Sequence, residues 1–230
     1  MRRARQIQCV NNVRQLGIVL HEFVSDNHIY PLEEDAEYDK SGFPINFNTW
    51  VDTLGHQLGL DYHRDSNFWN KGIWLCPSAQ YNDSRSSASA FESYGYNAVG
   101  IGTNLDSLGL GGHYGLTHFT GVGSEAVFKP PINESDIVSP SEMMSIGDGF
   151  EGNGSQFVSG QGLLWRNPSY TGWEIYTAAT VARHQSKANV VFCDGHVESL
   201  TLQFLFADTS DAALCRWNRD HQPHRERLAP

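Results

Sequence analysis

Residues 7 to 24 read IQCVNNVRQLGIVLHEFV, and their spacing sets the architecture expected of the whole chain. Apolar side chains recur at steps of three and four residues, which is the spacing of one face of an α-helix. These positions are Ile7, Val10, Val13, Leu16, Leu20, Phe23 and Val24. The pattern predicts one amphipathic helix from about Arg2 to Asn27, ended by polar residues before Pro31. At about 1.5 Å per residue, such a helix is roughly 39 Å long, more than most compact domains need.

The composition is that of a turn-rich protein with a core of its own. The chain has 230 residues, of which 40% are hydrophobic and 18% charged, so it is long enough to bury a core. The 22 glycines and 9 prolines predict many turns. A net charge of −10 argues against nucleic acid as a partner, because phosphate binding depends on clustered Lys and Arg. No stretch reaches the ~18 consecutive apolar residues of a membrane span.

Beyond the first helix, the sequence predicts short elements separated by long loops. Residues 31 to 48 are acidic and then rich in Gly and Pro, which indicates a loop, and a short helix follows at 50 to 60. Two Gly-rich excursions cover residues 101 to 126 and 149 to 173. Loops of this length inside a compact domain are usually functional or insertions.

The clearest local signal is a hairpin at residues 188 to 200. Two strand-like runs are joined there by Asp194 and Gly195, and Asp-Gly favours a two-residue turn because both positions tolerate positive φ. A short helix and a polar tail, residues 208 to 230, follow. The predicted fold class is therefore α+β, with a long N-terminal helix (residues 1 to 30) packed on a small antiparallel sheet inside one head (residues 31 to 230).

Both ends of the chain carry recognisable marks. The first is the run from Cys9 to Gly17, CVNNVRQLG, and the second is His184 followed after nine residues by Asp194-Gly195. Shorter pieces lie between them in the expected order, namely LCPS at 75 to 78, YGYN at 94 to 97 and PSE at 140 to 142. Together these residues resemble pseudopilin-like proteins with a prepilin-type cleavage and methylation signal, and the tail is similar to members from planctomycete and verrucomicrobial types of bacteria.

The resemblance implies a pilin-like fold and a non-catalytic structural or assembly subunit of a type II secretion or type IV pilus-like system. Its partners would be other pilin-like subunits, contacted through the N-terminal helix at Val10, Val13, Leu16 and Leu20. Such proteins are anchored in the inner membrane by an apolar half-helix, with a periplasmic or extracellular head. This sequence contains neither that half-helix nor the cleavage site. Either the membrane half of the helix is missing upstream of Met1, which is the expectation, or the chain is a soluble relative.

Two sets of residues are candidates for binding a metal, and neither set is required by the resemblance. His184, Asp194 and His196 combine two imidazoles with a carboxylate, a set suited to a transition metal. Asp148, Glu151 and Asn153 are oxygen ligands in a Gly-rich segment that suits calcium, which some pseudopilins bind near their C-terminal sheet. The alternatives are structural. Asp194 fits a tight turn for conformational reasons, and His184 fits a hydrogen bond to a loop backbone.

The four cysteines allow a disulfide if the protein is exported. Cys9 and Cys76 are the expected pair, because each flanks an element predicted in the core. No Gly-x-Ser-x-Gly, phosphate loop or His-Glu-x-x-His occurs, so we expect no enzyme activity. Two other functions stay open. One is an exported glycan- or protein-binding module using the two excursions with Trp165, Tyr170 and Trp173, and the other is a metal-dependent hydrolase at His184, Asp194 and His196.

Overall fold

The computed structural model describes residues 2–38, 44–60, 65, 68, 71–78, 93–101, 107–111, 114–115, 127–128, 130–149 and 183–228. The predicted N-terminal helix is confirmed as α1 (Arg2–Asn27). Its buried side chains recur at three- and four-residue steps, as at Val13, Leu16 and Leu20. No helix in the described residues is both long enough and apolar enough to cross a membrane.

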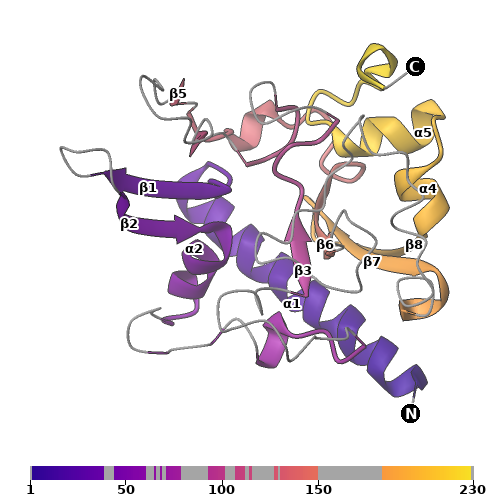
Figure 1. Cartoon of the computed structure of the whole chain (residues 1–230), viewed down its shortest axis with the longest axis horizontal. Helices are drawn as coiled ribbons and strands as arrows, with labels where there is room; N and C mark the ends of the chain where they lie inside the picture. The colour runs from indigo at the N-terminus through magenta and orange to yellow at the C-terminus, as the bar shows by residue number, and fades with distance from the viewer. Residues whose placement is uncertain are drawn as a thin grey trace.

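The centre of the molecule is a four-stranded antiparallel sheet in the order β3-β6-β7-β8. The strands are β3 (Tyr94–Tyr96), β6 (Met144–Asp148), β7 (Lys187–Phe192) and β8 (Val197–Thr201). α1 lies across this sheet and contacts β6, β7 and β8 (Figure 1). The predicted α+β class, with a long helix on a small antiparallel sheet, is therefore confirmed.

The loop that joins β7 to β8 differs in one respect from the sequence prediction. The backbone N–H of Phe192 donates to the His196 carbonyl, which leaves three residues in the loop. Gly195 has a φ of 87°, whereas Asp194 keeps a negative φ. A turn followed by a left-handed glycine is the usual form of a three-residue hairpin loop. The two-residue turn was wrong because only the glycine adopts positive φ.

Residues 31 to 48 were predicted as a loop, and this prediction was wrong. β1 (Glu34–Tyr38) and β2 (Pro44–Thr49) form an antiparallel ribbon with an irregularity after Glu37. Pro44 takes the first position of β2, where the missing N–H costs little. β2 leads directly into α2 (Trp50–Gln57), whose N-terminus is capped by the side chain of Asp52 on the backbone N–H of Thr49.

Both faces of the central sheet are covered. One core cluster lies between α1, α2 and the sheet, and includes Val13, Leu54 and Val191. A second lies under the C-terminal elements α4 (Leu202–Phe206), α5 (Asp211–Leu214) and η6 (Cys215–Trp217). Trp217 is completely buried there, so the segment expected as a polar tail is packed onto the head.

The remaining elements are short. They are η2 (Gly72–Trp74), η3 (Glu134–Asp136), η5 (Arg183–Gln185), η7 (Arg225–Arg227) and the two-residue strands β4 (Tyr114–Gly115) and β5 (Val127–Phe128), which pair with each other. Most of the two predicted excursions, residues 101 to 126 and 149 to 173, lies outside the described residues.

Candidate functional site

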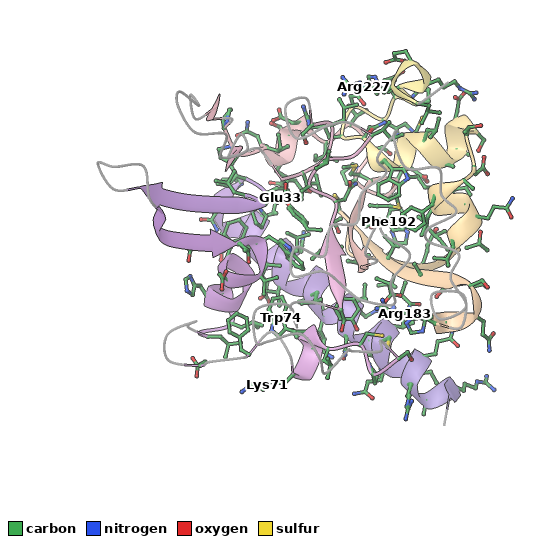
Figure 2. All side chains as sticks on the ribbon, viewed as in Figure 1. Glu33, Lys71, Trp74, Arg183, Phe192 and Arg227 are labelled. Carbon is green, nitrogen blue, oxygen red and sulfur yellow. The ribbon has the colours of Figure 1, made fainter. Side chains whose placement is uncertain are left out.

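A buried cluster of polar side chains joins α1 to the beginning of β7. Cys9 lies on α1, Cys76 follows η2, Asp148 ends β6, and Arg183 and His184 belong to η5. None of the five is more than 7% exposed. Figure 2 labels Arg183, which lies in η5 just before β7, and Phe192, the last residue of β7, and the cluster is on the side of Arg183. Segments far apart in the chain therefore meet at one end of the sheet.

Asp148 is the anion at the centre of this cluster. Nη2 of Arg183 donates to Oδ1 at 2.7 Å, and the backbone N–H and side-chain amide of Asn189 donate to Oδ2 at 2.7 and 3.1 Å. Burial alone would raise the pKa of Asp148, but the charges of Arg183 and His184 and the hydrogen bond from Asn189 hold it below its ordinary value. Asp148 is thus a buried carboxylate with a full set of partners.

His184 faces both the carboxylate and a thiol. Its Nε2 lies 3.3 Å from Sγ of Cys76 and 3.4 Å from Oδ2 of Asp148. Burial lowers the pKa of His184, but hydrogen bonds to Asp148 and Cys76 outweigh burial and raise it to about 9. Nδ1 of His184 is buried and has no hydrogen-bond partner in the described part of the chain. One ring nitrogen of His184, Nε2, therefore has partners, whereas the other, Nδ1, has none within the described residues.

The turn that carries His184 is strained. His184, Gln185 and Ser186 have φ values of 52°, 58° and 62°, all in the left-handed region that non-glycine residues rarely occupy. Three such residues in succession cost on the order of 1 kcal/mol each or more. The bonds from Arg183 to Asp148 and to the carbonyls of Gly149 and Ser93 fix the entry to this turn. In this left-handed conformation, the side chain of His184 lies in the buried cluster rather than in solvent.

Cys9 and Cys76 are free thiols in this structure, and both are completely buried. Their sulfur atoms and a ring nitrogen of His184 lie within 4.8 Å of one another. A hydrogen bond with Cys76 and burial raise the pKa of Cys9. Burial alone would raise the pKa of Cys76 as well, but the hydrogen bond from Cys9, the Arg183 charge and His184 lower it below the usual value. The pair is therefore an unequal one, with Cys76 the stronger acid.

The predicted metal-binding residues are not brought together. His184 precedes β7, whereas Asp194 and His196 follow it, so the length of the strand separates them. Oδ1 of Asp194 lies 2.6 Å from Nδ1 of the partly exposed His196, which also stacks on Phe192. Cys9, Cys76 and His184 are the one group of potential metal ligands found in the described residues. Two of them were not among the metal candidates.

The predicted calcium ligands do not form a site within the described residues. Both oxygens of Asp148 contact Arg183, His184 or Asn189. This carboxylate is therefore engaged by buried side chains of the protein and not by a calcium site. Glu151 and Asn153 lie outside the described residues, as do Trp165, Tyr170 and Trp173. The glycan-binding alternative stays a prediction.

The helix residues assigned to contacts between subunits belong to the protein's own core. Val13, Leu16 and Leu20 are at most 3% exposed, and Val10 is partly buried. The exposed side of α1 carries other apolar residues, Ile7 and Ile18. The sequence pattern identified the buried face at Val13, Leu16 and Leu20 but was wrong to include Ile7, and the buried face is used by the head itself.

Sequence reasoning missed Arg183 and Asn189, which organise the cluster through Asp148. A buried arginine requires a carboxylate, but nothing in the sequence pairs residue 183 with residue 148. The only usable signal was adjacency, since Arg183 directly precedes the motif residue His184. The chain was compared with models of protein families, with curated proteins and with solved structures, and none of them matched.

Proposed function

We propose that this chain is a pseudopilin-like assembly subunit that binds neighbouring subunits through the exposed side of α1. The observation that carries the proposal is the helix itself, which is longer than the part of it that the head buries. Residues 3 to 8 are exposed or half-buried, and Cys9 is the first completely buried residue. At about 1.5 Å per residue, these six residues extend roughly 9 Å beyond the buried part of the helix. Figure 1 shows this end of α1 projecting past the sheet.

The exposed side of α1 suits contact with another helix. Ile7 is 55% exposed and Ile18 is 52% exposed. They are eleven residues apart, which is about three helical turns, so both point to the same side. Asn11 and Arg14 lie between them and are also exposed. Single exposed apolar residues are common on protein surfaces, but two aligned on a projecting helix supply the apolar contact that helix-to-helix assembly needs.

The buried cluster supports a structural role in place of catalysis. Its thiols, imidazole and carboxylate are at most 5% exposed, which argues against direct contact with a substrate. The polar groups of the cluster connect four segments of the chain, namely α1, the segment after η2, β6 and the turn before β7. Such a cluster suits a head that must stay attached to its helix. The resemblance adds membrane anchorage through a segment ahead of residue 1, with the head on the periplasmic or extracellular side.

The test uses the protein expressed from its complete gene in its native host. Ile7→Glu and Ile18→Glu place a charge on the proposed contact and are expected to reduce sedimentable, membrane-associated or sheared assemblies at least tenfold. Val138→Glu is the matched control, because Val138 is 68% exposed and its backbone N–H donates to the carbonyl of Arg219 in the C-terminal segment, not to α1. Monomer levels should be equal in all variants. Assemblies that form equally well in all four proteins, or a wild-type product that stays monomeric and unassociated with membranes, would contradict the proposal.

A further inference from the structure

Cys9 and Cys76 meet although they lie on separate segments of the chain. We propose that the two cysteines form a disulfide in the working protein, and that this bond fastens α1 to the segment after η2 where the helix leaves the head. Cys9 is the first completely buried residue after the projecting residues 3 to 8. A bond at Cys9 would therefore fix α1 to the head at the point where the projection begins. This inference does not depend on the assembly function.

The backbone on both sides of the sulfur pair is already fixed. Asn12, one turn beyond Cys9, donates its side-chain amide to the carbonyl of Leu75 at 2.8 Å. The backbone N–H of Cys76 donates to Oγ of Ser93 at 2.7 Å. Asn12 and Ser93 are themselves buried. Because a disulfide tolerates little variation in backbone separation, these hydrogen bonds provide the placement that bond formation requires.

The same three ligands could be considered for a metal, but the surroundings favour the disulfide. A histidine that binds a metal almost always donates its second ring N–H to a carbonyl, carboxylate or water. Nδ1 of His184 has no such partner in the described residues. The nearest further ligand, Asp148, is already bonded to Arg183 and Asn189. The guanidinium of Arg183 next to Cys76 also opposes a dication at this position.

The chemistry is thiol–disulfide exchange with a donor disulfide, either a small molecule such as oxidised glutathione or an oxidoreductase. The Cys76 thiolate attacks one donor sulfur, and the donor's other sulfur leaves as a thiolate. Cys9, after losing its proton, attacks Cys76 and expels the second donor sulfur. The cysteines lose two electrons and two protons, and the donor is reduced to two thiols. Since both sulfurs are buried in the folded head, the donor reacts with Cys76 before α1 closes onto the head, and Cys9 attacks Cys76 as the helix docks.

The experiment refolds the full chain in the presence of oxidised and reduced glutathione, quenches with acid, alkylates free thiols and maps the peptides by mass spectrometry. The expected product links the Cys9 and Cys76 peptides with the loss of two hydrogens, while Cys193 and Cys215 are alkylated. Metal content is measured on the same sample. The proposal is overturned if Cys9 and Cys76 are both alkylated after oxidative refolding. It is also overturned if one equivalent of zinc protects both thiols until a chelator removes it.

Thermal unfolding gives a second readout. A bond between residues 9 and 76 closes a long loop, so the oxidised protein is expected to unfold about 10 °C above the reduced protein. Cys9→Ser and Cys76→Ser should abolish the effect of reductant, and Cys193→Ser should keep it. If the serine variants fail to fold, peptide mapping of the unaltered chain still decides. A reductant effect that persists in Cys76→Ser would also overturn the proposal.

Discussion

At the scale of single residues, Asp148 is the central carboxylate of the buried cluster. It accepts hydrogen bonds from Arg183 and from two groups of Asn189, and it faces His184. A buried ion pair adds little stability compared with well-packed apolar residues, but removing one partner leaves the other charge buried alone. Asp148 therefore matters less for the energy it contributes than for what its loss would leave behind.

Asp148→Asn is expected to lower the free energy of unfolding at pH 7 by about 3–5 kcal/mol, measured by urea denaturation, because the Arg183 charge loses its carboxylate. Asp194→Asn, at a partly exposed position, is the control and should change it by less than about 1 kcal/mol. The folded pKa of Asp148 is lowered, so its contribution is complete above pH 3.8 and disappears as pH falls through the folded value. Equal stability of Asp148→Asn and the unaltered chain at pH 7 would refute this role.

The sequence identified some of these residues but not their connections. The motif singled out His184, and the expected core elements singled out Cys9 and Cys76. Nothing in the sequence indicated that His184 faces Cys76, because the two are 108 positions apart and meet only through the packing of the helix on the sheet. A sequence motif can therefore single out a residue such as His184, but the hydrogen-bond partners of that residue are known only from the tertiary structure.

At the scale of elements, the contact between α1 and β7 is unusually close at Gly17. A Cβ atom built on Gly17 would lie 2.4 Å from Cγ2 of Val191, far inside van der Waals contact. The absence of a side chain at this position lets the helix axis approach the strand. Any side chain at position 17 would therefore collide with Val191 unless α1 moved away from β7.

Gly17→Ala is expected to destabilise the protein by about 1–3 kcal/mol, because overpacking outweighs the gain in helix propensity of up to about 1 kcal/mol. Gln15→Ala, at an exposed position on the same helix, is the control and should be nearly neutral. The measurement is urea denaturation with a double-mutant cycle. Combining Gly17→Ala with Val191→Ala should cost less than the sum of the two single changes. Strict additivity, or a stabilised Gly17→Ala, would show that the close contact does not control the packing.

Periodicity predicted some elements well and composition predicted others poorly. The existence of α1 could be predicted because apolar residues recur at three- and four-residue steps from Ile7 to Val24, within the 26 residues of the helix. β1 was missed because its residues are mostly acidic, and β2 because the alternation of Ile45 and Phe47 with Asn46 and Asn48 is short, although the two backbones pair along the whole ribbon. Strand pairing is a property of the backbone, so a short ribbon can form with little signal in the sequence.

At the scale of the whole molecule, the sheet is sandwiched between α1 on one face and the C-terminal elements on the other. The side-chain amide of Asn97 donates to the carbonyls of Met144 and Trp217, which ties β6 to the C-terminal segment. The sequence predicted only the α1 side. Trp217 stands between Arg216 and Asn218 in a polar run, and its burial depends on where the chain turns back, which local patterning does not encode.

The architecture has a consequence for assembly. One face of α1 is used completely by the head, through Val13, Leu16 and Leu20. In the proposed assembly, the opposite side of α1 and its projecting first turns are the parts of the helix left to meet another subunit. Assembly and folding would thus use different faces of the same helix, and a change at Ile7 or Ile18 should alter assembly without unfolding the head.

The most direct test of this account is site-specific photo-crosslinking in the protein expressed from its complete gene in its native host. A photoreactive amino acid replaces Ile7, Ile18 or, as the control, Val138. The account predicts crosslinked products containing two or more subunits from positions 7 and 18 and only single chains from position 138. Single chains from all three positions, in cells where the protein is folded and abundant, would contradict assembly through α1.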